Sequence, residues 1–544
     1  MIMLRSLAQQ EKYFLGITIV SLLLIISVPY LWAWSITPAG FHFSGILFNS
    51  GDQNVHLAWA RQAYEGHFTL RDMFTSESLG TDNSLFINLY TTAIGISARL
   101  THISIIWMAH LFRLIFAVLA MVWFYDFCSQ LTTSVRTRYL ALLFAAFSTG
   151  VGWLWPLFPN ILFMDKPNMP DFPMMPESYV FTSAYTFGLN IASLALIVLV
   201  YGQLLRAEQK QSWKNVGVAA IAAFLLANIH TYDALPMLGV LGIWTFWRLT
   251  QRKSTFSVLA LGTVIVGAIL PVIYQYIVFQ HDTQFRLKAI TYTQAPHLPD
   301  VLVSYGLVFI FAIAGVILFW RLRQNTRHLL LIAWIFVTII VIYVPALLGH
   351  PISFERKMIE GMHWPLCILA AIGLAACLER IHSLPLRNIA AASVVIISSI
   401  SSFQFVVWSV ATAQDRQHSQ NNALMPPLYI SNGDQAAINY LKIHYDNQKA
   451  VLSLAPIGNY IPPQTGMTVY LGHWAETINY QQKELRTMQF FQGGMSPKKA
   501  KMWLNQNHIG YILIGSYERQ IDATLPLPLK PIFTSGTSTI YTVK

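Results

Sequence analysis

FLGITIVSLLLIISVPYLWAW, at residues 14–34, contains no charged side chain. A helix crosses the hydrocarbon core of a bilayer in about 20 residues, so this stretch is long enough to span a membrane. Similar apolar runs recur along the first three quarters of the chain, at 105–127, 139–158, 186–205, 216–230, 232–249, 255–279, 301–320, 329–349, 362–380 and 389–412. The sequence therefore predicts a polytopic α-helical membrane protein with about 11 transmembrane helices.

The composition indicates the same class of protein. Of the 544 residues, 55% are hydrophobic and 11% are charged, whereas an ordinary soluble domain has about 25% charged residues. This contrast excludes an ordinary soluble enzyme. Disordered chains and coiled coils are excluded as well, because both need more charge and less apolar content.

The distribution of Lys and Arg predicts the side of the membrane on which each connection lies, because cytoplasmic loops are enriched in both. With the N-terminus inside, the cytoplasmic connections hold Arg136, Arg138, Arg206, Lys210, Lys214, Arg252, Lys253, Arg321, Arg323, Arg327, Arg380 and Arg387. The opposite connections, 35–104, 159–185, 280–300 and 350–361, hold eight basic and twelve acidic residues. Most of the excess of basic residues behind the net charge of +11 follows this rule. The sequence therefore indicates membrane lipids, and no nucleic acid, as partners.

The chain divides into two domains by its sequence texture. Residues 1–412 form the predicted transmembrane domain, with 35–104 as its first extracytoplasmic loop. In the tail, 413–544, helical and strand patterns alternate: a helix from Asn432, strands at 450–455 and 468–471, a helix from Ser496-Pro497, and strands at 511–514, 531–534 and 539–543. We expect a small extracytoplasmic α/β domain there.

The first outer loop contains a distinctive polar segment, NSGDQNVHLAWARQAYEG, at residues 49–66. From Asp52 onward the pattern predicts a short helix that ends at Gly66. Asp52 would lie at the N-terminus of this helix, with His56 one turn later on the same side. Two roles are open for Asp52: a catalytic carboxylate, or an N-cap that accepts backbone N–H groups. A second apolar stretch, 83–100, is expected to lie in the membrane interface.

The order of these features resembles the GT-C superfamily of membrane glycosyltransferases. The features are an anchor helix, Gly51-Asp52, an aromatic- and Ala-rich segment closing in Tyr64-Glu65-Gly66, interfacial helices, and a span with Arg113 near its start. The superfamily includes protein O-mannosyltransferases, the catalytic subunits of oligosaccharyltransferases and bacterial aminoarabinose transferases acting on lipid A. Gln53 stands where the O-mannosyltransferases have Glu, and the Trp-Trp-Asp signature of the oligosaccharyltransferases is not present.

This resemblance implies transfer of a sugar from a polyprenyl-phosphate-linked donor to a glycan, lipid or protein acceptor. The phosphate leaves as an anion and needs no general acid, whereas glycoside hydrolysis uses two carboxylates. Asp52 is then the candidate base that takes a proton from the acceptor in a direct inverting displacement. Members of the superfamily differ in their use of metal, so a divalent cation is a candidate cofactor without assigned ligands.

A donor phosphate requires nearby cations, and Arg offers a rigid fork of donors. The outer loops hold four candidates: Arg286, Lys288, Arg356 and Lys357. For each of them the alternatives are binding to lipid headgroups and pairing with Glu355, Glu360 or Asp282. Arg113 is a fifth candidate, roughly 12 Å into its span at the helical rise. From there it can contact the phosphate, extend to the outer surface or pair with a buried acid.

Accessory roles are open to a further set of residues. His230 and Asp233 lie between two spans, where they can share a proton or a metal ion, or satisfy the backbone of a broken helix. In the tail, GHWAET at residues 472–477 can hold an acceptor or sugar, or simply end a strand. The complete set of accessory candidates is His56, His230, Asp233, Glu355, His473 and Glu476.

The loop 159–178 is rich in Pro and Met. It contains three acids, Asp165, Asp171 and Glu177. This composition fits either a flap that closes over a cavity or an ordinary solvated loop.

We therefore hypothesise a glycosyltransferase of the cell envelope that uses a lipid-phosphate-linked sugar at the outer membrane face. Ion-coupled transporters usually carry ionisable groups near the midplane of the membrane. Apart from Arg248, Glu379 and Arg380 at the cytoplasmic ends of their spans, only Arg113, Asp126 and Asp233 are charged inside the predicted spans. A lipid flippase or transporter is the alternative from another class. A non-catalytic relative that only binds polyprenyl lipid is the third.

Overall fold

The computed structural model describes residues 7–80, 84–154, 175–251, 255–289, 291–322, 328–418 and 427–543. Contacts divide the chain into two compact units. Unit 1 consists of Met1–Val28, Leu111–Gln275 and Tyr292–Trp408, and unit 2 of Pro29–His110, Tyr276–Thr291 and Ser409–Lys544. Unit 2 thus unites the tail with most of the first predicted outer loop, and the domain boundary at residue 412 stays a prediction.

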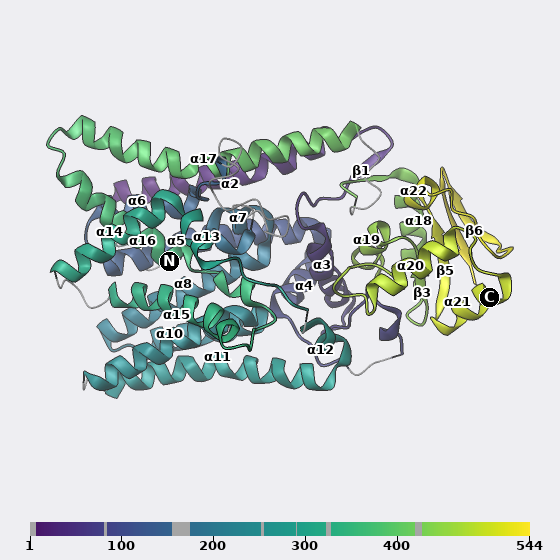
Figure 1. Cartoon of the computed structure of the whole chain (residues 1–544), viewed down its shortest axis with the longest axis horizontal. Helices are drawn as coiled ribbons and strands as arrows, with labels where there is room; N and C mark the ends of the chain where they lie inside the picture. The colour runs from purple at the N-terminus through teal and green to yellow at the C-terminus, as the bar shows by residue number, and fades with distance from the viewer. Residues whose placement is uncertain are drawn as a thin grey trace. The chain divides into compact units, whose positions relative to one another are not determined.

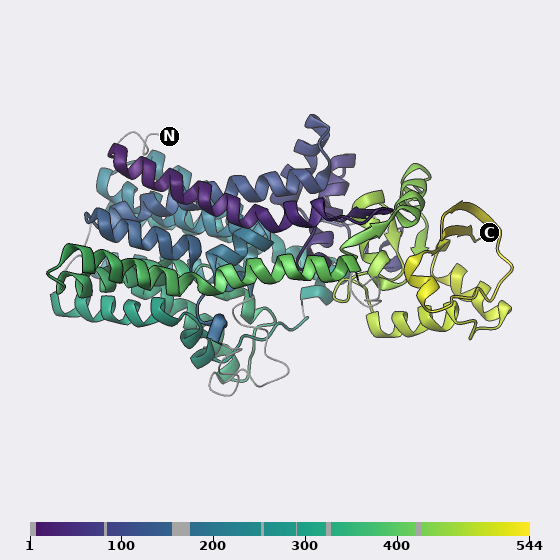
Figure 2. The same ribbon diagram turned by 90° about the horizontal axis from the view of Figure 1, so that it is seen from above.

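Unit 1 is built from helices, several of which continue into unit 2. They are α2 (Gln9–Ser35), α5 (Ile105–Leu131), α6 (Val135–Phe147), η2 (Gly152–Leu154), η4 (Pro176–Ser178), α7 (Val180–Thr186), α8 (Gly188–Lys210), α9 (Trp213–Ile229), α10 (Thr231–Thr250), α11 (Thr255–His281), α13 (Leu298–Ser304), α14 (Gly306–Leu322), α15 (His328–Leu347), η5 (Glu355–Ile359), α16 (His363–Glu379) and α17 (Leu384–His418). The long helices run side by side (Figures 1 and 2), and the tightly packed pairs include α8 with α9 and α14 with α16.

The described part of the chain contains 7 helices that are long and apolar enough to cross a membrane, or 8 if the bent pair α13 and α14 is one span. The polytopic helical class is therefore confirmed. The count of eleven is not confirmed, because three of the predicted runs form helices outside this set. These three are α6, α9 and α10.

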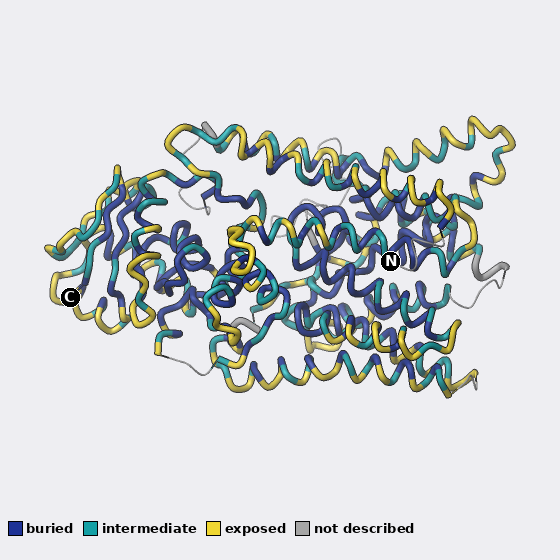
Figure 3. Tube along the Cα trace, turned by 180° about the vertical axis from the view of Figure 1, so that it is seen from behind, coloured by how far each residue is buried: buried dark blue, intermediate teal, exposed yellow. Residues whose placement is uncertain are grey.

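Burial separates a core from a lipid-compatible surface in unit 1. The apolar windows of α8 and of the segment Glu355–Glu379 are 83% and 78% buried, whereas that of α11 is 33% buried. Figure 3 shows exposed positions along α11, and Val266 and Leu270 of this helix are 57% and 56% exposed. Exposed apolar surface of this extent is expected where a helix faces lipid.

Two glycines explain how closely α14 and α16 pack in the core. A Cβ atom on Gly315 would lie 2.2 Å from the carbonyl oxygen of Leu369, and one on Gly373 would lie 2.1 Å from that of Phe311. Neither position can hold a larger residue without moving a helix backbone. Small residues at such contacts are typical of helix pairs in membranes.

Unit 2 contains a mixed sheet with helices around it. Its elements are β1 (Phe41–Phe43), α3 (Ser50–Glu65), η1 (Ser76–Ser78), α4 (Leu89–Thr101), α12 (Thr283–Ala289), β2 (Tyr429–Ser431), α18 (Asn432–Ile443), β3 (Ala450–Leu452), α19 (Ala455–Thr465), β4 (Thr468–Val469), α20 (Tyr480–Phe491), α21 (Pro497–Gln506), β5 (Ile509–Ile514), α22 (Ser516–Gln520), β6 (Pro531–Ser535) and β7 (Ser538–Thr542). The sheet has the order β4-β3-β5-β7-β6, with β3 parallel to β4 and β5 and with the other pairs antiparallel.

The predicted α/β character of the tail is confirmed. Every strand and helix predicted from residue 432 onward is present, and Ser496 is the N-cap of α21 as its position before Pro497 indicates. Strands β1 and β2, which pair antiparallel, were not predicted. They join the segment after the first helix to the beginning of the tail, and so bring the first outer loop into the same unit as the sheet.

Candidate functional site

Helix α3 presents Asp52 in its first turn. The helix begins at Ser50, after Asn49, whose φ of 46° and ψ of 43° place it in the left-handed region. It ends before Gly66, which has a φ of 99°, as the sequence predicts. A carboxylate in the first turn of a helix is stabilised by the positive end of the helix dipole.

Asp52 contacts two side chains of unit 2. Its Oδ2 atom accepts a hydrogen bond from Asn49 Nδ2 at 2.8 Å, and its Oδ1 atom lies 3.2 Å from His473 Nε2. The side chain of His473 is 2% exposed, whereas that of Asp52 is 48% exposed. The carboxylate of Asp52 therefore lies half-exposed, with a buried imidazole beside it.

The backbone determines which nitrogen of His473 faces Asp52. The N–H of Ala475 donates to His473 Nδ1 at 3.2 Å, so in the neutral ring Nδ1 is the acceptor and Nε2 carries the hydrogen. Gly51 makes room for this ring, because a Cβ atom there would lie 3.1 Å from His473 Nε2. The glycine before Asp52 thus has a steric role, because Gly51 leaves space for the ring of His473 that Asp52 contacts.

The loop that carries His473 is attached to the first outer loop by buried hydrogen bonds. Thr477 Oγ1 donates to the carbonyl oxygen of Phe74 at 2.7 Å and accepts from the N–H of Gly472 at 3.1 Å. Deeper in unit 2, Asn54 Nδ2 of α3 donates to Asn459 Oδ1 of α19 at 2.7 Å. These bonds hold the two sides of the Asp52–His473 contact in place.

An ion pair strengthens the same junction. Lys483 Nζ lies 2.5 Å from Glu77 Oε2 and donates to Thr75 Oγ1 at 3.0 Å. Burial alone would raise the pKa of Glu77, but the contacts with Lys483 and Thr75 lower it below the ordinary value. Burial lowers the pKa of Lys483, and Glu77 opposes that shift. Sequence reasoning missed this pair and the Asn54–Asn459 bond, because neither has a local signature.

An aromatic cluster connects α3 to α12. The ring of His56, one turn after Asp52, lies edge-on to Trp59 with 4.9 Å between centroids. Trp59 in turn contacts Phe285 of α12 at 6.3 Å. Arg286, the next residue, is exposed. Unit 2 therefore presents the carboxylate of Asp52 and an exposed guanidinium on two helices that are joined by packed aromatic rings.

The remaining candidates of unit 2 have different surroundings. Glu476, three residues after His473, is 6% exposed and its N–H donates to the carbonyl oxygen of His473. Lys288 belongs to α12, and its side chain lies outside the described part of the structure. The roles of both residues stay predictions.

Unit 1 brings together another polar group, made of His230, Asp233 and Glu360. His230 stands at the break between α9 and α10, and its Nδ1 atom lies 2.9 Å from Asp233 Oδ2. The same Nδ1 atom lies 3.5 Å from Glu360 Oε2. The structure thus confirms the proximity of His230 and Asp233. Sequence reasoning treated Glu360 only as a partner for nearby cations.

The cations of η5 have partners within unit 1. Arg356 Nη2 lies 3.2 Å from Glu177 Oε1, and Lys357 Nζ lies 4.6 Å from the centroid of the Tyr232 ring. Glu355 accepts a hydrogen bond from the hydroxyl of Tyr292 at 3.0 Å. Glu177 is one of the three acids of the loop 159–178. The other two, Asp165 and Asp171, lie outside the described residues.

Arg113 donates to backbone oxygens. Its Nη1 atom is 2.7 Å from the carbonyl oxygen of Ala184 and 3.1 Å from that of Tyr185, and the residue is 4% exposed. Both carbonyls belong to the last turn of α7, where a cation is favoured by the helix dipole. The structure adds a role that the sequence did not indicate: Arg113 donates to the carbonyl oxygens at a buried helix end. The three roles predicted from the sequence stay predictions.

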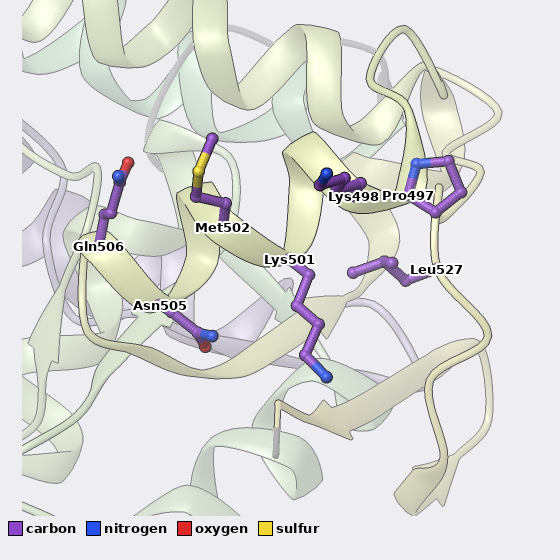
Figure 4. Close-up of a pocket in the computed structure, with 7 residues that line it drawn as sticks. All are labelled: Pro497, Lys498, Lys501, Met502, Asn505, Gln506 and Leu527. Atoms are coloured by element: carbon purple, nitrogen blue, oxygen red, sulfur yellow. The ribbon is translucent and has the colours of Figure 1, made fainter.

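A pocket lies on the surface of the tail. It is lined by residues of α21 together with Leu527. In Figure 4, Lys498, Met502 and Gln506 follow one side of the helix, while Lys501 and Asn505 point to another side, as the helical spacing requires. The residues that line it include no acid, and neither Asp52 nor His473 belongs to them. We assign no role to this pocket in the site.

No protein-family model and no curated protein matches the sequence. Solved structures do match. Arabinofuranosyltransferase AftD from Mycobacteria aligns with a TM-score of 0.53 and 14% identity over 96% of this chain and 40% of that chain. ArnT from Cupriavidus metallidurans, bound to undecaprenyl phosphate, aligns with a TM-score of 0.51 and 10% identity over 96% and 98%. The oligosaccharyltransferase AglB from Archaeoglobus fulgidus gives a TM-score of 0.48 and 11% identity over 90% and 69%.

These neighbours are GT-C glycosyltransferases. The chain has a GT-C-like fold, with several apolar helices and a small C-terminal sheet region, and is a multi-pass membrane protein. At 10–14% identity the likeness describes the fold. The chemistry has to be argued from the residues of the site itself.

Proposed function

We propose that this protein is a membrane glycosyltransferase that transfers a sugar from a polyprenyl-phosphate-linked donor to an acceptor of the cell envelope at the outer membrane face. The contact between Asp52 and His473 is the observation that carries the proposal. It presents a half-exposed carboxylate whose Oδ1 atom lies 3.2 Å from the Nε2 atom of a buried imidazole, in a GT-C-like fold. The structure of ArnT was solved with undecaprenyl phosphate, which supports a donor of this class.

In the proposed reaction an acceptor hydroxyl attacks the anomeric carbon of the donor sugar. The bond between that carbon and the phosphate oxygen breaks, and the polyprenyl phosphate leaves with the electron pair. Asp52 takes the proton of the hydroxyl as the new glycosidic bond forms. A single displacement of this kind inverts the configuration of the anomeric carbon.

His473 acts as a positioning residue in this scheme. Its Nε2 hydrogen faces Asp52 Oδ1, while Asn49 holds Oδ2. The two contacts restrict the rotation of the carboxylate, so that one set of lone pairs stays directed to the acceptor. Positioning of a base contributes to the rate because the reacting atoms must be aligned before the proton moves.

Arg286 is the cation that we propose for the donor phosphate within unit 2. It is exposed, and α12 is joined to α3 through the contact of Phe285 with Trp59. A guanidinium can bind two phosphate oxygens at once. Phosphate binding by Lys288, Arg356, Lys357 and Arg113 stays a prediction from the sequence.

Purified protein tests the proposal when it receives labelled polyprenyl-phosphate sugars and a membrane extract as the source of acceptor. We expect label to move into the extract with the native protein and with Glu65→Gln, which removes another acid of α3 that pairs with Arg61. We expect Asp52→Asn to bind the donor lipid but to transfer little label.

Two results would contradict the proposal. Translocation of the labelled lipid across proteoliposomes without transfer would support a flippase. Donor binding without transfer or translocation, for every sugar and acceptor fraction, would support a non-catalytic lipid-binding protein.

A further inference from the structure

Three side chains of unit 1 converge with the geometry of a metal site. His230, Asp233 and Glu360 each offer one ligand atom, and these atoms all lie within 4.8 Å of one another. All three residues are buried. Their convergence requires two segments that are distant in the sequence, the α9–α10 break and the residue that follows η5.

The local backbone holds each ligand in place. His230 has a φ of −146° and a ψ of 77°, which interrupts the helix between Ile229 and Thr231. Asp233 follows three residues later in the first turn of α10. Glu360 precedes Gly361, whose φ of 89° turns the chain into α16. Ligands on such fixed elements keep their geometry without an ion, which lowers the cost of binding one.

The acids of the cluster lack enough partners among the described residues. Both carboxylate oxygens of Glu360, and Oδ1 of Asp233, are buried without a hydrogen-bond partner there. Arg356 lies beside Glu177 instead. His230 contacts both acids, and the charge of Lys357 acts on Glu360. A buried ionised carboxylate costs several kcal/mol where its partners do not compensate its charge. A divalent cation would neutralise both and would be coordinated by the oxygens that have no partner.

The ligand set selects among ions. A tetrahedral Zn²⁺ site with bonds of about 2.1 Å has ligand atoms roughly 3.4 Å apart. The separations of His230 Nδ1 from Asp233 Oδ2 and from Glu360 Oε2, 2.9 and 3.5 Å, lie on either side of that value. Mg²⁺ and Ca²⁺ prefer oxygen alone, whereas an imidazole with carboxylates suits a transition metal.

We propose that His230, Asp233 and Glu360 bind one divalent transition-metal ion, Zn²⁺ or Mn²⁺. Three protein ligands leave at least one coordination position for water or for an anionic oxygen, as in metal sites that act on a ligand. The site does not include Asp52. It does not depend on the proposed transferase activity: the ion can be present whether or not a sugar is transferred.

Metal binding to the full-length protein in detergent tests this proposal. The protein is treated with EDTA, dialysed, and titrated with Zn²⁺, measured by elemental analysis, and with Mn²⁺, measured by electron paramagnetic resonance. We expect one ion per chain for at least one of the two metals. Glu360→Gln and Asp233→Asn should each weaken its binding by at least about tenfold, as ligand losses do.

Glu355→Gln is the matched control. Glu355 is another buried acid of the same loop, but it contacts Tyr292 and Ala295 rather than His230. Its removal should leave the metal affinity within about twofold of the native value. If Glu360→Gln does not fold, Asp233→Asn supplies the comparison.

A thermal shift gives a second readout. The ion should raise the melting temperature of the native protein and of Glu355→Gln but should raise that of Glu360→Gln much less, because binding to the folded state alone stabilises it. The proposal is overturned if the native protein binds neither metal, as expected if Asp233 and Glu360 merely share a proton, or if the Glu355 and Glu360 variants bind equally well. A native protein that binds neither metal and still transfers sugar would overturn this proposal and leave the proposed function intact.

Discussion

The contact of Asp52 with His473 shows that local sequence patterns can identify two candidate residues without indicating that they lie together. The helix around Asp52 has local signals, since Gly66 ends it and His56 falls one turn after the acid. The motif around His473 has its own local signal in Gly472 and Trp474. No local sequence pattern indicates that Asp52 and His473 lie in contact, because the contact requires the tail and the first outer loop to fold into one unit.

Substitution of His473 tests its role as a positioning residue. His473→Ala removes the imidazole whose Nε2 atom lies 3.2 Å from Asp52 Oδ1. In the proposed reaction this contact tightens to a hydrogen bond with the charged carboxylate, which is worth about 1.5–3 kcal/mol. We expect kcat to fall by about ten- to hundredfold while KM changes little. His473→Gln keeps an N–H donor near the same place and should recover part of the rate.

A purely structural role for His473 predicts a different pattern. Both variants would then lose folded protein in parallel, and the folded fraction would keep the native kcat. Measurement of kcat per folded molecule, with the donor varied at saturating acceptor, separates the two accounts.

Arg113 illustrates a different limit at the same scale. The sequence shows a charge in an apolar run and so indicates that the residue has a function or a partner. Its partners are the carbonyl oxygens of Ala184 and Tyr185, which have no side-chain signature. The sequence therefore indicates that a buried arginine needs hydrogen-bond acceptors, but it does not indicate which groups accept from it.

Among the elements, those with strong caps were predicted and those held by tertiary packing were not. α21 follows Ser496-Pro497, and the turn at Gly536 separates β6 from β7. α19 contains Pro462 and Pro463, which local rules place outside helices. It is helical nonetheless, because most of its residues are buried, among them Asn459, which bonds to Asn54 of α3.

The junction between β3 and α22 should make the tail sensitive to pH. Glu518 is buried, and its carboxylate accepts from the N–H groups of Leu454 at 2.6 Å and Gly515 at 2.9 Å. Burial raises its pKa to about 7, although these hydrogen bonds oppose the shift. The folded state therefore holds this proton more tightly than the unfolded state does. The resulting stabilisation is complete below the ordinary pKa of 4.5 and is lost as the pH rises through about 7.

Hydrogen exchange of the full-length protein checks this expectation. After correction for the intrinsic rate, the protection of the β3 amides should fall between about pH 5 and about pH 8, by up to roughly 3 kcal/mol. Glu518→Gln should remove most of the pH dependence, and Glu484→Gln, an acid that contacts Tyr480, should keep it. An unchanged pH dependence in Glu518→Gln would assign the effect to another group.

At the scale of the whole molecule, apolar length predicted the class of protein, whereas the number of spans stays a prediction. α6 has 13 residues and α9 has 17, and α13 meets α14 at a 96° bend. A hydropathy pattern records apolar residues whether they face lipid or a protein core, so buried and broken helices look like spans. The layout common to GT-C enzymes was visible in the order of segments, and the solved structures of AftD and ArnT share this fold.

The basic residues of the loops also predict the orientation of the chain. Trp474, in the tail, is 59% exposed and should face the outside of the cell, whereas Lys210, at the end of α8, should face the cytoplasm. In intact cells a membrane-impermeant maleimide should label Trp474→Cys and leave Lys210→Cys unlabelled until the membrane is opened. The parent chain is the blank, and the reverse pattern would invert the topology.

The proposal that Asp52 is the base is tested most directly by a single-turnover measurement. Native protein and Asp52→Asn are saturated with labelled polyprenyl-phosphate sugar, acceptor is added, and the rate of product formation is compared at equal occupancy of donor. Loss of a general base predicts a rate lower by about 10²–10⁴-fold with donor affinity unchanged. Equal rates for the two proteins would contradict the account.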